Sequence, residues 1–125
     1  MTVAEVLELY YEEHQNDISE NMLLGWIAEL DTKIVSELNK GREGLSEQAF
    51  LKDMETSFTL NAPKEYSEIY TVYLSMRTAY FLGEIERYNN SAMLFNRLSF
   101  EMSNFISRNY KLKDNRKIKV EFNNA

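Results

Sequence analysis

The chain contains no cysteine and only one histidine among its 125 residues. The lack of cysteine excludes disulfides and thiolate metal sites, and it is compatible with a reducing compartment. A di-iron helical bundle needs two Glu-x-x-His pairs, which a sequence with one histidine cannot supply. His14 follows two glutamates near the expected end of a helix, where an imidazole commonly interacts with the helix dipole. We therefore expect no metal site.

Motifs for catalysis are also missing. No glycine-rich phosphate loop is present, because Gly41 and Gly44 lack both the spacing and the Lys-Ser/Thr that would follow. No nucleophile motif of the Gly-x-Ser-x-Gly kind occurs. The sequence therefore predicts no catalytic residue and no cofactor, and a protein that is not an enzyme.

One proline and four glycines leave few positions that would interrupt a helix, and 44% hydrophobic residues are sufficient for a packed core. The length corresponds to one domain. No apolar run approaches the roughly 20 residues needed to cross a bilayer, and the acidic start TVAEVLELYYEE is unlike a secretory signal. The composition predicts a soluble all-α protein without a membrane partner.

The spacing of apolar residues predicts a small bundle of about four helices. A capping box formed by Thr2 and Glu5 starts the first helix, and Asn16, Asp17 and Ser19 are good turn or N-cap residues before the second. Residues 41–62 predict an irregular loop with short extended pieces, and residues 117–122 alternate like a short strand. The helices are expected at about 2–13, 19–38, 63–88 and 90–110, followed by a C-terminal tail.

The third helix is expected to be long and central, because its polar stripe of Glu68, Thr71, Ser75 and Thr78 is narrow. Either its own chain covers the remaining surface or neighbouring subunits share it. Four tyrosines share one side of this helix, with an arginine placed for a cation–π contact; they are Tyr66, Tyr70, Tyr73 and Tyr80. Tyrosines of this kind suit a packed core and also a subunit interface. The candidate interface residues here are Tyr70, Tyr73 and Arg77.

The junction between the third and fourth helices carries three further candidates, Tyr88, Asn89 and Asn90. One interpretation is structural: an asparagine caps the fourth helix while the tyrosine packs at the corner. The other interpretation is that this corner contacts a partner subunit. The sequence leaves both open.

Charge is distributed unevenly. Residues 1–60 hold 13 acidic and 4 basic side chains, a net of −9, whereas residues 61–125 hold 7 acidic and 10 basic ones, a net of +3. Opposite potentials could align neighbouring copies head to tail, although the halves could also simply be solvated differently. The overall charge of −6 argues against free nucleic acid as the main partner.

We divide the chain into a helical domain, residues 1–110, and a basic tail, residues 111–125. The tail is a candidate for non-specific contact with DNA in a channel or for contact with an acidic face of a neighbour. A solvated terminus is the alternative. The candidate residues in the tail are Lys111, Lys113, Arg116, Lys117 and Lys119.

Three segments together resemble one protein family. They are WIAELDTKI at 26–34, APKEYSEIY at 62–70, and GEIERYNNSAMLFN at 83–96. This combination is similar to the head–tail connector adaptor, or head-completion, proteins of tailed bacteriophages. Members of that family are small helical, non-enzymatic subunits that form a ring, typically of twelve copies, under the portal.

The resemblance implies a structural virion protein, made in the host cytoplasm and located in the neck of the particle. Its expected partners are further copies of itself, the portal protein, and a stopper or tail-completion protein. Two alternatives remain open on the sequence: another neck or tail-completion component, and a phage-encoded helical regulator that binds a protein.

Overall fold

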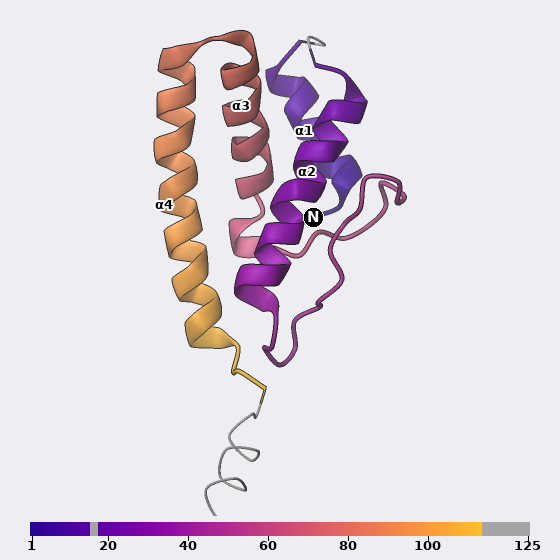
Figure 1. Ribbon diagram of the computed structural model, residues 1–125, viewed down its shortest axis with the longest axis vertical. Coiled ribbons are helices and arrows are strands. Elements are labelled where there is room, and N and C mark those ends of the chain that lie inside the picture. The colour runs from indigo at the N-terminus through magenta and orange to yellow at the C-terminus, as the bar shows by residue number, and fades with distance from the viewer. Residues whose placement is uncertain (16–17, 114–125) are drawn as a thin grey trace, which may run out of the picture.

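A computed structural model shows a bundle of four α-helices and describes residues 1–15 and 18–113. Within this part of the chain only two isolated β-bridges and no strands occur. The predicted all-α bundle is therefore confirmed (Figure 1). The elements are α1 (Val3–Glu13), α2 (Glu20–Ile34), a π-helical turn (Val35–Asn39), a 3₁₀ turn (Lys64–Tyr66), α3 (Ile69–Leu82) and α4 (Ile85–Asn109).

Local capping fixes the starts of the first two helices. The Thr2 hydroxyl accepts a hydrogen bond from the Glu5 amide at 3.2 Å, and the Glu5 carboxylate accepts one from the Thr2 amide at 2.9 Å. Ser19 accepts a hydrogen bond from the Met22 amide at the start of α2. These contacts confirm the predicted capping box and identify Ser19, one of the three candidates, as the N-cap of α2.

The third helix ends earlier than predicted. Gly83 has a φ of 73° and terminates α3 in the left-handed conformation, so α3 stops at Leu82 rather than near residue 88. The next helix then begins at Ile85, and Asn89 and Asn90 lie in its second turn. The prediction that one of these asparagines caps the fourth helix is therefore wrong; Glu84 holds the N-cap position without a side-chain cap bond.

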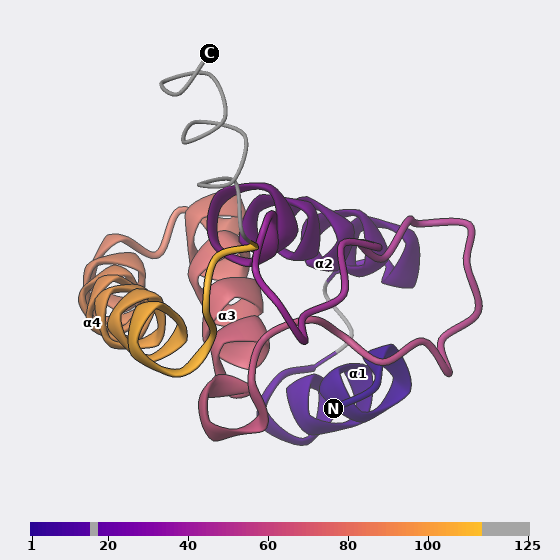
Figure 2. The same cartoon turned by 90° about the horizontal axis from the view of Figure 1, so that it is seen from below.

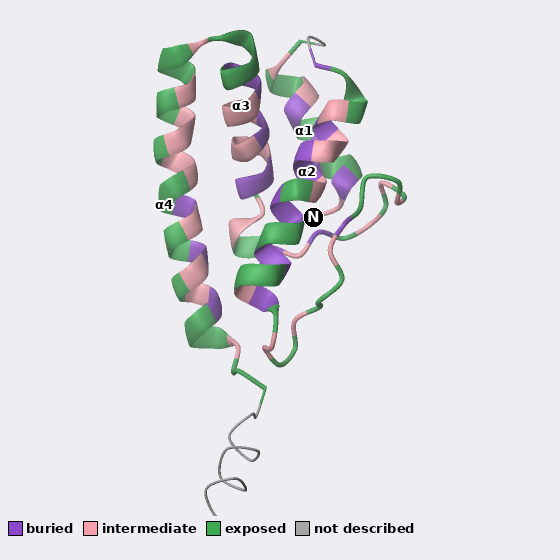
Figure 3. Cartoon of the chain, in the orientation of Figure 1, coloured by how far each residue is buried: buried purple, intermediate pink, exposed green. Residues whose placement is uncertain are grey.

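Helix α3 lies at the centre of the bundle, as expected. It packs most extensively against α4, and also against α2 and α1. Figure 2 shows α4 on one side of α3, with α1 and α2 on the other. The core draws side chains from every helix and from the loop; its most deeply buried members include Val6, Leu23, Ile27, Phe50, Ile69, Leu74, Met102 and Ile106. Figure 3 shows that exposed residues dominate the outer side of α4.

One buried carboxylate holds the long connection between α2 and α3. Oδ1 of Asp31 accepts hydrogen bonds from the Asn61 amide and the Tyr70 hydroxyl, at 2.9 and 2.7 Å. Oδ2 accepts from the Phe50 amide and from Asn61 Nδ2, at 2.8 and 2.7 Å. Four donors match the roughly four acceptor positions of an ionised carboxylate, which compensates its complete burial.

The first residues of the same loop, directly after the π-helical turn, pair with the beginning of the tail. The Glu43 amide donates to the Lys111 carbonyl at 2.8 Å, and the Lys113 amide donates to the Gly41 carbonyl. Arg42 reinforces this pairing by donating from Nη1 to the Tyr110 carbonyl at 2.8 Å. The prediction of a loop with short extended pieces is confirmed, whereas the strand predicted at residues 117–122 lies outside the described residues.

Candidate functional site

Two residues of the polar stripe of α3, Ser75 and Thr78, face the interior. The Thr78 hydroxyl lies 2.8 Å from the Tyr10 hydroxyl, and the Ser75 hydroxyl lies 2.9 Å from Nε2 of His14. The His14 ring also stacks on Tyr10, with ring centroids 4.4 Å apart. These polar contacts connect the end of α1 to α3. They include the single histidine, His14, whose contact with α3 could not be predicted from its position in the sequence.

Of the predicted interface tyrosines, Tyr70 belongs to the core. Its side chain is 1% exposed and its hydroxyl is bonded to Asp31. Burial, and then the nearby Asp31 charge, raise the pKa of the Tyr70 phenol far above its usual value near 10. The interface alternative is therefore wrong for Tyr70, because its side chain is already enclosed by its own chain.

Tyr73 and Arg77 lie where α2, α3 and α4 come together. Tyr73 packs on Phe95 of α4 with ring centroids 5.3 Å apart, and burial raises the pKa of its phenol. The Arg77 guanidinium lies 5.3 Å from the centroid of the Trp26 ring and 5.8 Å from that of Tyr73. Sequence reasoning anticipated a tyrosine partner but missed Trp26, because residues on different helices give no spacing signal. Arg77, which is partly exposed and also pairs with Glu29 of α2 at 3.4 Å, thus joins α2 to α3.

A cluster of large apolar side chains is exposed where α3 turns into α4. We call it the corner patch, and its members are Tyr80, Phe81, Leu82 and Ile85, which are 72%, 56%, 44% and 74% exposed. Tyr88 packs beside it, its ring centroid 5.6 Å from that of Tyr80. The predicted candidate Tyr88 is therefore at the edge of an exposed apolar surface. Of its four members, sequence reasoning considered Tyr80 as a core or interface residue but did not select Phe81, Leu82 or Ile85.

A small pocket of about 240 Å³ lies next to the corner patch, between the ends of α1 and α3 and the start of α4. The predicted candidate Asn90 lines it, together with Glu13, His14, Glu84 and Arg87. Arg87 and Glu84 form an ion pair at 3.2 Å. Across residues 1–15 and 18–113, no group of three or more acidic or histidine side chains is placed to hold a metal ion.

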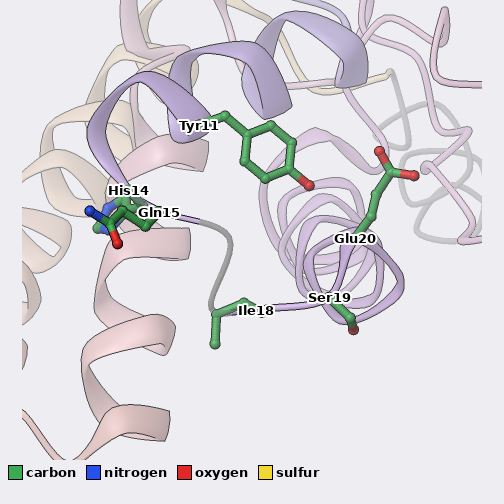
Figure 4. A pocket seen from close by; sticks show the side chains of 6 residues that line it. All are labelled: Tyr11, His14, Gln15, Ile18, Ser19 and Glu20. Carbon is green, nitrogen blue, oxygen red and sulfur yellow. The ribbon is translucent and has the colours of Figure 1, made fainter.

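A wider hollow lies between the end of α1 and the start of α2 (Figure 4). The Tyr11 ring projects from α1 toward α2, where the Glu20 carboxylate lies. Burial, followed by the Glu20 charge, raises the pKa of the Tyr11 phenol. A phenol held in its neutral form beside one carboxylate supplies neither a nucleophile nor a base, so we assign no chemistry to this hollow.

The outer side of α4 carries a line of uncharged side chains, which we call the outer strip. Its members follow one another at spacings of four and three, so they share one face of the helix. Met93 and Phe100 are 72% and 70% exposed. The predicted candidate Asn89 is part of this line. The outer strip consists of Asn89, Met93, Asn96, Phe100, Ser103 and Ser107.

The described part of the tail is held at the opposite end of α4 from the corner patch (Figure 1). Nζ of Lys113 lies 2.8 Å from Oε2 of Glu47. This hydrogen bond, and then one from the Gly41 amide, lower the pKa of the Glu47 carboxyl. Lys111 is exposed. The remaining candidates of the tail, Arg116, Lys117 and Lys119, lie outside the described residues.

No family model, no curated protein and no solved structure matches this chain. None of the helices in residues 1–15 and 18–113 combines the length and the apolar character needed to cross a membrane.

Proposed function

We propose that this protein is a structural subunit of the neck of a tailed bacteriophage, a head–tail connector adaptor that assembles as a ring beneath the portal. The corner patch is the observation that carries the proposal. Four large apolar side chains lie at one helix corner and keep between 44% and 74% of their surface exposed. Contiguous exposed apolar surface of this kind marks protein contact, since burying it against a partner contributes roughly 25 cal/mol per Å².

The two ends of α4 support a linking role. The corner patch lies at its start and the basic tail begins at its end, after 25 residues of helix. At 1.5 Å per residue this separates the two surfaces by about 37 Å. A subunit with an apolar end and a basic end suits a protein placed between two different neighbours, here the portal with its DNA channel and the stopper or tail.

The resemblance to connector adaptors gives the proposal its biological setting. The segment at 83–96 covers Ile85 of the corner patch, Tyr88 beside it, and the first half of the outer strip. Ring formation, the twelve copies and the neck location come from this resemblance, as does the absence of catalysis.

A pair of matched substitutions tests the proposal. Leu82→Asp places a charge in the corner patch, whereas Leu51→Asp makes the same change at a comparably exposed leucine of the loop. A phage that lacks its own copy would be supplied with the parent protein or with either variant. We expect the parent and Leu51→Asp to restore tailed particles that contain the protein at the neck, and Leu82→Asp to yield tailless heads that lose DNA.

Circular dichroism of both purified variants would establish that they keep the helical content of the parent. Purified particles without the polypeptide would refute the neck assignment. Restoration by Leu82→Asp as complete as that by Leu51→Asp would remove the corner patch from the mechanism. A protein missing from particles but bound stoichiometrically to a host factor would support the regulator alternative instead.

A further inference from the structure

Two exposed helix faces of this subunit point in opposite directions. Helix α3 lies between α1 and α4, so the outer face of α1 and the outer strip of α4 look away from each other (Figure 2). Surfaces arranged in this way cannot meet within one chain. They can meet only when one copy contacts the next.

The outer strip has the pattern of a helix-packing surface. Its four-and-three spacing is the one by which helices pack side by side, and it continues for five turns. Met93 and Phe100 are its large apolar members. Arg97 and Arg108 lie exposed along one edge, where Arg97 pairs with Glu101 at 3.9 Å. Including Glu86 and Glu101, α4 carries three arginines and two glutamates, a net charge of +1.

The outer face of α1 offers a complementary surface. Leu9 is 38% exposed, and Glu5, Leu9 and Glu12 repeat the four-and-three spacing. Four exposed glutamates, Glu5, Glu8, Glu12 and Glu13, surround this leucine, and α1 contains no basic residue. This helix therefore presents one apolar contact point within a net charge of −4.

We infer that α1 of one copy packs on the outer strip of the next, with Leu9 seated between Met93 and Phe100. The charges favour a second copy of this chain as the occupant. The acidic face of α1, with a net charge of −4, meets α4, with a net charge of +1, and the same polarity holds for the chain as a whole, −9 in residues 1–60 against +3 in residues 61–125. Packing of α4 on α4 would leave the α1 carboxylates without this compensation.

This contact is head to tail, because it joins two different faces. Each added copy leaves one free α1 and one free outer strip, so the series ends only when it closes into a ring. The inference rests on the proposed function, to which it adds the two surfaces that join neighbouring subunits.

The lack of cysteine permits a direct test by disulfide trapping. Leu9→Cys and Met93→Cys are made singly and together, and Leu51→Cys, at an exposed leucine of the loop, replaces Leu9→Cys as the control. After mild oxidation of concentrated protein, a mixture of the two single variants should give a crosslinked dimer and no larger species. The double variant should give a ladder of oligomers. Added salt should reduce the yield, because it screens the attraction.

Two results would overturn the inference. A mixture that crosslinks no faster than the Leu51→Cys and Met93→Cys control would show that α1 and α4 do not meet. Met93→Cys that crosslinks to itself faster than to Leu9→Cys would show that α4 packs on α4. The proposed function is tested separately. If the double variant forms a ladder but the protein is absent from particles, the interface between α1 and α4 stands and the neck assignment is rejected. If the protein is present at the neck but forms no ladder, the neck assignment stands and the interface is rejected.

Discussion

The Tyr70 hydroxyl donates a hydrogen bond to Oδ1 of Asp31 at 2.7 Å, and this contact joins α3 to α2 across 39 residues of sequence. The same hydroxyl accepts a hydrogen bond from the Ala62 amide. Asp31 belongs to the segment at 26–34 and Tyr70 to the segment at 62–70, so two of the three segments behind the family resemblance meet at this point. Their residues are explained by the folding of the loop. The third segment, residues 83–96, contains no buried residue and is therefore available for contacts between subunits.

Replacing Asp31 by Asn should destabilise the protein by about 2–4 kcal/mol. Asparagine keeps one acceptor oxygen, but its NH₂ group would face the two donors that now bond to the other oxygen. If the NH₂ group replaces Oδ2, these donors are the Phe50 amide and Asn61 Nδ2. The free energy of unfolding, measured in urea, tests this. Glu37→Gln, at an exposed carboxylate of the π-helical turn, should change it by less than about 0.5 kcal/mol. Equal stabilities of Asp31→Asn and the parent would show that the network contributes little.

Stability should fall as the pH rises above about 10, the usual pKa of a tyrosine. In the unfolded chain the Tyr70 phenol ionises there, whereas in the folded protein burial keeps it protonated. The unfolded state then binds fewer protons than the folded state, so each further pH unit lowers the free energy of unfolding by up to about 1.4 kcal/mol for this residue. Tyr73 and Tyr11, whose pKa values are also raised by burial, contribute in the same direction.

Urea titrations at pH 9, 10 and 11 would measure this slope. Tyr70→Phe should be less stable than the parent at pH 7, because the bonds to Asp31 and Ala62 are lost, but its decline above pH 10 should be shallower. Tyr80→Phe is the control, since that side chain is 72% exposed. A decline that is unchanged in Tyr70→Phe would contradict the expectation.

Local sequence determined what could be predicted about the helices. The starts of α1 and α2 were predictable because each cap lies within three residues of its partner. The end of α3 was missed because a single glycine inside a helical pattern, here Gly83, does not by itself predict a left-handed backbone conformation. The Asp31 network was beyond prediction, since its partners lie 19, 30 and 39 residues away.

The candidate site was predicted only in outline. The junction of the third and fourth helices was selected as a candidate site, but the apolar run of Tyr80, Phe81 and Leu82 could not be assigned to the inside or the outside. Hydrophobic periodicity shows which residues share a face and not which face a small protein leaves uncovered. The polar residues of α3 were equally hard to place from the sequence. Ser75 and Thr78 were expected to mark a solvent-facing stripe, but their hydroxyls bond to His14 and Tyr10.

Glu47→Gln should loosen the beginning of the tail. The hydrogen bond from Lys113 holds the pKa of the Glu47 carboxyl below its ordinary value, so the contact is complete at neutral pH and is lost as the pH falls below about 4.3 through the lowered pKa. Because the pair is exposed, global stability should hardly change. Hydrogen exchange should show a few-fold faster exchange of the Glu43 and Lys113 amides, which bond across this junction.

The matched control is Glu55→Gln, an exposed carboxylate elsewhere in the loop, which should leave the exchange of both amides unchanged. Lowering the pH should loosen the parent protein toward the Glu47→Gln behaviour, once the intrinsic effect of pH on exchange is corrected. Identical exchange in Glu47→Gln and the parent would show that the backbone bonds alone hold the tail.

Two glycine substitutions should have opposite effects, and the contrast tests how the corner patch is formed. Gly83 has a φ of 73° with nothing within 4 Å of an added Cβ, so Gly83→Ala should cost about 1 kcal/mol through backbone conformation alone. Gly25 lies inside α2, also with open space around it, so Gly25→Ala should stabilise the protein by about 0.5–1 kcal/mol. Thermal unfolding of both variants measures the difference. A stabilising Gly83→Ala would mean that α3 and α4 can join without the left-handed turn, and the corner patch would then lose its structural basis.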